Sequence, residues 1–280
     1  MKGIPYLAEV GSLMYASLAT RPDIMYATNK LSQFNADPGI PHWTALQWVL
    51  CYLKRTRNLA LTLGGTIKPQ LTGYMDSDYA GCTDTCQSTS GYIFTLGYGS
   101  VSWSSKQQSI VTTLSCEAKY VASCHATKEA MWLWRLLELL GFWQLTTTIH
   151  SDNASSISLT KDAAFHARSK HIDVQFHYTH EQVTAGDILF KYLPTADMPA
   201  DIMTKALAWP KHDKFVMLLS LSSHCDNSPS PQWGGVLKYW RSCDVNTLVN
   251  VSTSTAACPP TMWTCFTLTI VSFPLDIIYI

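Results

Sequence analysis

The chain has 280 residues, which exceeds one typical domain and leaves room for two. Hydrophobic side chains make up 47% of it, an ordinary share for a globular protein that buries a core. Lysine plus arginine equals aspartate plus glutamate, at 20 each, so the formal net charge is zero. This balance argues against a chain whose main task is non-specific phosphate binding, because such binding depends on accumulated cations.

The charges are nevertheless unevenly distributed. Residues 1–69 carry seven basic and three acidic side chains, whereas residues 70–208 carry nine basic and thirteen acidic ones. A basic beginning beside an acidic middle suits a metal-binding domain next to a surface that meets a polyanion. Random unevenness among exposed charges is the alternative.

The nine cysteines are scattered, with no Cys-x-x-Cys pair and no cysteine and histidine set at zinc spacing. No charged-then-apolar leader opens the chain. We therefore expect reduced thiols in an intracellular protein, cytoplasmic or nuclear. The last stretch, Thr264–Ile280, is apolar but interrupted by Pro274 and Asp276, and it is shorter than the ~20 residues of a membrane span. We expect no membrane anchor there.

The chain begins with predicted helices. Residues 5–35 have helical spacing, broken at Arg21-Pro22, and an amphipathic helix follows from Trp43 to Leu53. The second helix ends in the basic residues Lys54, Arg55 and Arg57. Cations there suit the helix dipole. A basic edge that touches a nucleic-acid backbone is the alternative, and both interpretations stay open.

The middle of the chain predicts one mixed sheet with helices on its faces, an α/β fold. The expected strands are 71–79, 91–96, 101–103, 110–113, 146–150 and 188–193. The expected helices are 115–141, one that starts at 152, 172–183 and 199–207. The chain loses its periodicity after about residue 222, and we expect the tail to be poorly ordered.

Acidic residues accompany these elements. Asp76 and Asp78 lie two apart at the end of the first strand, so they share a face. Glu117, Asp152 and Asp201 lie at the starts of helices or the ends of strands. Four carboxylates from four elements would repel unless a cation held them, and oxygen ligands of this kind suit Mg²⁺ or Mn²⁺. Separate, solvated positions at element ends are the alternative.

The segment 71–207 resembles the ribonuclease H domain of Ty1/copia-type retrotransposon polyproteins. The matching runs are Tyr74–Gly81, Ser88–Phe94, Ser102–Gln107, Leu114–Tyr120, Trp132-Leu133, Ser151–Asn153, Arg168–Asp173 and Met198–Lys205. The N-terminal part is similar to the end of the reverse transcriptase of that family, with Val10–Tyr15, Thr20–Ile24, His42-Trp43 and Tyr52–Lys54.

The resemblance implies three regions. Residues 1–69 would be a small helical thumb-like segment of reverse transcriptase, residues 70–208 a ribonuclease H-like domain, and residues 209–280 a divergent, poorly ordered tail. The domain is expected to have a mixed five-stranded sheet with helices on both faces.

The resemblance also implies an activity, cleavage of the RNA strand of an RNA–DNA hybrid by two Mg²⁺ or Mn²⁺ ions. Carried over by motif, the catalytic and metal-binding residues are Asp76, Glu117, Asp152 and Asp201, with Asp78 as the alternative for the first. The remainder of the retrotransposon polyprotein is the expected partner. A catalytically inactive relic that at most binds nucleic acid is the alternative function.

Three departures from the family pattern bear on activity. Tyr79 replaces a tryptophan, Cys86-Gln87 replaces a basic pair, and Lys119 stands where an acid is common. Lys119 is two residues past Glu117, so we expect it to point away from the carboxylates. Nucleic-acid contacts are predicted for Lys106, Arg168, Lys170 and His171, with ordinary solvated positions as the alternative.

Overall fold

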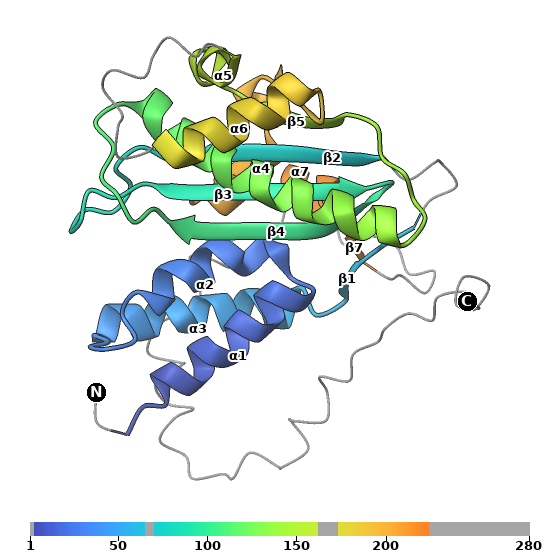
Figure 1. Cartoon of the computed structure of the whole chain (residues 1–280). Helices are drawn as coiled ribbons and strands as arrows, with labels where there is room; N and C mark the ends of the chain where they lie inside the picture. The colour runs from blue at the N-terminus through green and yellow to red at the C-terminus, as the bar shows by residue number, and fades with distance from the viewer. Residues whose placement is uncertain (1–2, 65–69, 162–172, 224–280) are drawn as a thin grey trace. The chain divides into compact units, whose positions relative to one another are not determined.

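The computed structural model describes residues 3–64, 70–161 and 173–223, all within one compact unit that spans residues 1–225 (Figure 1). Three helices come first: α1 (Tyr6–Ala19), α2 (Met25–Ser32) and α3 (Ile40–Arg55), with the short 3-10 turn η1 (Pro22–Ile24) between the first two. The helices confirm the predicted pattern and bury a core of their own, made of Tyr6, Val10, Leu13, Ile24, Leu31 and Leu46.

A mixed five-stranded sheet follows, in the order β4-β3-β2-β5-β6. Its strands are β2 (Leu71–Ser77), β3 (Thr89–Leu96), β4 (Gly99–Gln107), β5 (Thr147–Ser151) and β6 (Ile188–Tyr192). The first three are antiparallel neighbours, and β5 and β6 run parallel to β2. Central strand β2 therefore ends beside β5, which brings residues distant in the sequence to one edge.

The predicted strand 110–113 is wrong, because β4 ends at Gln107 and the following residues form turns that lead into the next helix. The predicted helix 199–207 is shorter and tighter, the 3-10 helix η5 (Pro199–Met203). Both segments were predicted from apolar spacing alone. Such spacing does not show whether a neighbouring strand is available for pairing or whether there is room for a full helix.

Helices cover both faces of the sheet, as Figure 1 shows. Helix α4 (Ser115–Leu139) crosses β2 and β3, and α5 (Ala154–Lys161) and α6 (Asp173–Ala185) pack against it. The opposite face holds η5 and α7 (Trp209–Leu218). Alternation along β3 separates the two cores, since Phe94 faces α4 and Ile93 faces η5. The predicted ribonuclease H-like α/β fold is confirmed.

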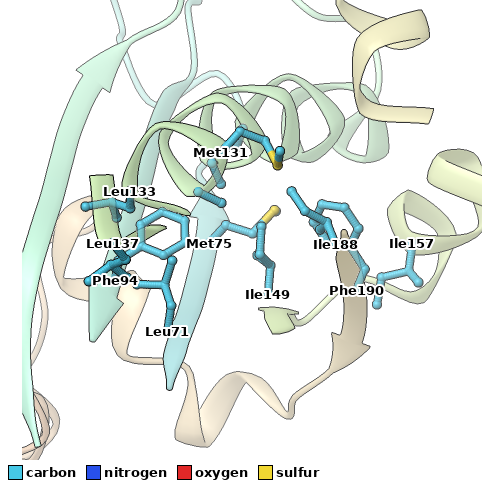
Figure 2. Close-up of a cluster of buried hydrophobic side chains, with 13 residues drawn as sticks. Leu71, Met75, Phe94, Met131, Leu133, Leu137, Ile149, Ile157, Ile188 and Phe190 are labelled. Carbon is cyan, nitrogen blue, oxygen red and sulfur yellow. The ribbon is translucent and has the colours of Figure 1, made fainter. Parts of the chain in front are cut away.

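Figure 2 shows the core under α4. Leu71 and Met75 of β2 and Phe94 of β3 meet apolar side chains of α4, β5 and β6 there. Gly73 of β2 makes room for the Phe94 ring, because a Cβ at this position would lie 2.6 Å from it. This packing fixes how α4 lies on the sheet, and with it the direction of every side chain in the first turn of the helix.

The chain does not lose order at residue 209, so the expectation of a poorly ordered tail is wrong for residues 209–223. Helix α7 buries Phe215 and Val216, and β7 (Leu221–Ser223) pairs antiparallel with β1 (Leu59–Leu61). Apolar spacing typical of a helix is present in residues 209–218, but the segment lies past the last matching run, Met198–Lys205. Residues 224–280 lie outside the described residues. The boundary at residue 69 stays a prediction.

Among the helices in the described ranges, none has the length and apolar character needed to cross a bilayer.

Candidate active site

Asp76 lies near the end of β2, and its side chain is completely buried. Opposite it on β3 is Gly91, where a Cβ would lie 2.5 Å from the Cβ of Met203. Glycine at this position therefore lets η5 approach the sheet. As a result the Thr204 hydroxyl donates a hydrogen bond to Asp76 Oδ2, and Lys205 Nζ lies 3.0 Å from the same oxygen.

The second oxygen of Asp76 faces Lys119, from the first turns of α4. Lys119 Nζ lies 3.1 Å from Asp76 Oδ1 and also forms a close ion pair with Asp152 Oδ1. The distance to Asp76 is that of an ion pair, although the geometry is not that of a hydrogen bond, and Oδ1 has no hydrogen-bond partner. Lys119 thus joins two carboxylates through one ammonium group.

Asp152 directly follows β5, whose parallel pairing with β2 brings it close to Asp76. Its Oδ2 accepts a hydrogen bond of 2.8 Å from the Thr195 hydroxyl. Its side chain is 5% exposed and that of Lys119 is 14% exposed, so the pair is largely removed from water. Ion pairs in such a setting resist screening by salt.

Asp201, in η5, is the third buried carboxylate. Lys205 Nζ lies 2.8 Å from its Oδ1 and Lys211 Nζ lies 2.5 Å from its Oδ2. Burial disfavours the charged form of Lys205, but the charges of Asp76 and Asp201 and their hydrogen bonds outweigh it and raise the pKa of this lysine. Lys205 therefore stays protonated and bridges two carboxylates.

The structure consequently brings three of the four predicted acids into one chain of alternating charges. In order, the members of this lysine ladder are Asp152, Lys119, Asp76, Lys205, Asp201 and Lys211. Three carboxylates face three ammonium groups, and their formal charges cancel.

Glu117 does not join the lysine ladder. Its Oε2 accepts hydrogen bonds from the backbone N–H of Thr113 at 3.0 Å and from the Thr113 hydroxyl at 3.4 Å. A glutamate in the first helical turn that reaches back in this way satisfies a backbone donor at the helix start. In the described structure Glu117 therefore stabilises the start of α4.

The expectation that Lys119 points away from the carboxylates is wrong. Successive helix residues are rotated by about 100°, so Glu117 and Lys119 do point to opposite sides. The packing of α4 on the sheet, however, turns the Lys119 side toward Asp76 and Asp152 and the Glu117 side toward Thr113. The rotation of the helix about its own axis, which spacing cannot supply, decided the outcome.

Asp78, the alternative first acid, has a local role. Its Oδ1 accepts a hydrogen bond from the backbone N–H of Thr89, and a Cβ at Gly81 would collide with its carboxylate. Burial raises the pKa of Asp78, while the bond from Thr89 works against the rise. Asp78 therefore fastens the loop after β2.

The predicted nucleic-acid contacts are only partly placed. Lys106 is exposed near the end of β4 and lines a groove with His125 and Lys128 of α4. Arg168, Lys170 and His171 lie outside the described residues.

The residues present do not fit a pair of divalent ions. In the part of the chain that the structure describes, no group of three or more His, Cys, Asp or Glu side chains is arranged to hold a metal. Both oxygens of Asp76 and of Asp201 already face an ammonium group. A cation beside Asp76 would meet the like charges of Lys119 and Lys205, so the lysine ladder takes the place that the sequence assigned to metal.

Lys205, Lys211, Thr195 and Thr204 complete this site and were not predicted from the sequence. Lys205 follows Asp201 by four residues, and that spacing on a helix is itself a signal for an ion pair. Lys211 belongs to the segment that was interpreted as tail. Thr195 and Thr204 carry no signal in a single sequence.

Together, the sheet order and the acids at the ends of β2 and β5 define a ribonuclease H-like domain. No protein-family model matches the chain. It is 40% identical over 224 residues to the Retrovirus-related Pol polyprotein from transposon TNT 1-94 of Nicotiana tabacum, covering 80% of this chain and 17% of that protein. It is 38% identical over 237 residues to the corresponding polyprotein from transposon RE2 of Arabidopsis thaliana, covering 83% and 16%.

The chain belongs to the Ty1/copia-type retrotransposon Pol polyproteins, and it spans only 17% and 16% of the length of those two relatives. A further relative is the Secreted RxLR effector protein 161 of Plasmopara viticola, 49% identical over 135 residues, which are 48% of this chain and 94% of that protein.

Among the solved structures that are similar to the chain are two complexes with nucleic acid. A foamy viral protease-reverse transcriptase in complex with double-stranded DNA matches 68% of this chain and 32% of its own, at 16% identity and a TM-score of 0.44. LC11-RNase H1 in complex with RNA/DNA hybrid matches 48% and 94%, at 14% identity and a TM-score of 0.36.

Proposed function

We propose that this Pol segment binds RNA–DNA hybrids through its ribonuclease H-like domain and does not cleave them. The observation that carries the proposal is the position of Lys119, whose ammonium group joins Asp76 to Asp152. Membership of the Pol family supports the choice of ligand, because the resemblance implies a hybrid substrate.

Electrostatics argues against metal binding while the lysine ladder is intact. Two unit charges of the same sign about 4 Å apart repel by about 4 kcal/mol at the effective dielectric of a protein surface, and a divalent ion doubles each term. A cation beside Asp76 would face this repulsion from Lys119 and from Lys205, both already within 3.1 Å of the carboxylate. Bound metal would therefore require the lysines to leave.

The test measures binding and cleavage separately. A fluorescent RNA–DNA hybrid is titrated with the full chain in EDTA and in Mg²⁺, and the RNA strand is then analysed on a denaturing gel. We expect equal affinity in both conditions and an intact RNA strand. Mg²⁺-dependent cleavage by the unaltered chain would refute the proposal that the domain does not cleave hybrids. Absence of binding would refute the proposal that an RNA–DNA hybrid is the ligand.

A metal-dependent hybrid ribonuclease is the second candidate, favoured by the convergence of Asp76, Asp152 and Asp201 in one network. It requires Lys119 and Lys205 to swing away when two Mg²⁺ or Mn²⁺ ions bind. Under this candidate, Asp76→Asn abolishes a cleavage that the unaltered chain performs. If neither protein cleaves, the first proposal stands.

A further inference from the structure

A basic groove lies between α4 and the edge of the sheet formed by β3 and β4. It has a volume of about 270 Å³, and Lys106 of β4 and His125 and Lys128 of α4 supply its basic side chains. The remaining walls come from Ser90, Tyr92, Ser104 and Glu129. The groove is separate from the lysine ladder, since none of its lining residues belongs to it.

Strand register places the groove within reach of the acidic end of β2. Lys106 is paired with Ser90, and Ser90 is paired with Ser77, which directly follows Asp76. Neighbouring strands lie about 4.8 Å apart, so the backbone at Lys106 is roughly 10 Å from β2. A nucleic-acid duplex that lies over the end of β2 is wide enough to touch both places.

The charges in the groove favour an anion. Lys106 and Lys128 are both exposed, and neither forms an ion pair with another described residue. One acid, Glu129, lines the groove, and its carboxylate accepts a hydrogen bond of 2.6 Å from the Ser102 hydroxyl. Two cations that lack acidic partners thus stand opposite each other, one on the strand and one on the helix.

The Ser90 hydroxyl in the groove can donate a hydrogen bond to an anion. Ser90 Oγ accepts from Gln108 Nε2 at 2.8 Å, which leaves the hydroxyl hydrogen available to a ligand. Burial, reinforced by Glu129, raises the pKa of Tyr92, so its phenol stays protonated and is hydrogen-bonded to the Glu129 carboxylate. Hydrogen bonds from a lysine to a phosphate are charge-assisted and stronger than neutral ones, and the Ser90 hydroxyl adds a neutral donor beside them.

We propose that this groove binds one phosphodiester group of a nucleic-acid strand, held between Lys106 and Lys128 with His125 beside it. The inference rests on the proposed function for its natural ligand, the backbone of an RNA–DNA hybrid. Beyond the proposed function, it states where one nucleic-acid strand lies and names the three residues that contact its backbone.

His125 gives the groove a direct spectroscopic readout. Burial is the main cause that lowers its pKa, and Lys128 and Lys106 lower it further. The other titratable groups at the groove are Glu129 and Tyr92, one engaged by Ser102 and the other protonated. A phosphate bound between the lysines offsets their charge, so the pKa of His125 must rise when the groove is filled.

The first experiment titrates the full chain with inorganic phosphate and follows the His125 ring by NMR across pH. A rise in the pKa of His125 supports the groove even if the hybrid is not the natural ligand. An unchanged pKa at saturating phosphate overturns the proposal, whatever the hybrid assay shows.

The second experiment measures hybrid affinity against salt for the double variant Lys106→Ala/Lys128→Ala. We expect weaker binding and a salt slope reduced by about 1 for each lysine that contacts a phosphate. The matched control is Lys191→Ala, an exposed lysine on β6 at the other edge of the sheet. If the unaltered chain binds the hybrid and the double variant behaves like the control, the groove is refuted and the proposed function survives.

Discussion

Lys119 Nζ lies 3.1 Å from Asp76 Oδ1, and the same ammonium group pairs with Asp152. One side chain on α4 thereby holds the ends of β2 and β5 together electrostatically. A divalent cation between two carboxylates would perform the same task in a metal-dependent nuclease. The ammonium group differs from a metal ion in two ways. It is covalently attached to α4 and cannot dissociate, and it does not activate a water molecule for attack.

Replacing Lys119 with glutamate should create a cation site. The Lys119→Glu variant places a third carboxylate beside Asp76 and Asp152, and their mutual repulsion favours a divalent ion. We expect the variant to melt at a higher temperature in Mg²⁺ than in EDTA, by the equivalent of about 2.7 kcal/mol at a hundredfold excess over Kd. The unaltered chain should melt at the same temperature in both.

The control for this prediction is Lys119→Met, which removes the charge and keeps most of the volume. It leaves the buried Asp76 with Lys205 as the remaining ammonium partner among those described, so we expect a loss of roughly 3 kcal/mol in the free energy of unfolding. It should respond to Mg²⁺ less than Lys119→Glu does, because it adds no carboxylate ligand beside Asp76 and Asp152. A response of Lys119→Met equal to that of Lys119→Glu would show that the added carboxylate is not a ligand.

His212 should make the stability of the fold depend on pH. Its ring packs against Tyr52 and Trp209, with centroids 5.7 Å and 6.0 Å away, and burial lowers its pKa even though Asp23 works in the opposite direction. Below the ordinary histidine pKa of about 6.5, the unfolded chain therefore binds a proton more readily than the folded chain does. We expect the free energy of unfolding to fall as the pH drops through this value.

The measurement is chemical denaturation of the full chain and of His212→Gln between neutral and mildly acidic pH. His125 and His150 also have lowered pKa values, so the unaltered chain keeps part of the dependence in either case. The informative quantity is the difference between the two proteins, which should shrink as the pH falls. A difference that is constant with pH would mean that His212 does not titrate with folding.

Much of the sheet could be predicted from the sequence, because its strands are marked by alternation and by glycine and serine turns. The convergence of Asp76 and Asp152 was expected from the family resemblance and not from the strand pattern, and the parallel pairing of β2 with β5 brings it about. The sequence did not predict that Lys119, and not Glu117, would reach Asp76 and Asp152. Both lie in the first turns of α4, and which of them reaches the acids depends on how Ala118 and Tyr120 are buried.

The approach of η5 to the sheet was equally invisible in the sequence. It depends on Gly91, where the missing Cβ leaves space for Met203. Single-sequence reasoning could identify a glycine in a strand as a possible close contact, but it could not say what makes the contact. Lys205 and Thr204 reach Asp76 only as a consequence of this packing.

Gly91→Ala tests that packing. The new Cβ would lie 2.5 Å from Met203 Cβ and 2.8 Å from Thr204 Cγ2, so η5 must move outward. We expect a loss of about 1–3 kcal/mol in the free energy of unfolding, as for other overpacked cores. Gly11→Ala is the matched control, since Gly11 lies in α1 with nothing within 4 Å of the added Cβ. That variant should be stabilised by about 1 kcal/mol. Equal changes in the free energy of unfolding for the two variants would mean that η5 does not pack closely against β3 at Gly91.

Truncation tests whether residues 209–223 belong to the folded unit. A chain that ends at Ala208 loses α7 and β7, and with them the fully buried side chains of Phe215 and Leu219 and the strand partner of β1. Burial of a single phenylalanine is worth about 3–5 kcal/mol, comparable to the total stability of many domains. We expect this chain to be unfolded or aggregated, as judged by circular dichroism and size-exclusion chromatography.

A chain that ends at Cys225 keeps both elements and is the control. It should melt cooperatively, because the compact unit of residues 1–225 is retained whole. Phe215→Ala in that shorter chain separates side-chain burial from chain length, and it should lower the free energy of unfolding by about 3–5 kcal/mol. If the chain ending at Ala208 melts like the one ending at Cys225, then α7 contributes nothing to the domain. In that case the ion pair between Lys211 and Asp201 would not be needed for folding, and the part of the lysine ladder that matters for stability would end at Asp201 and its partner Lys205.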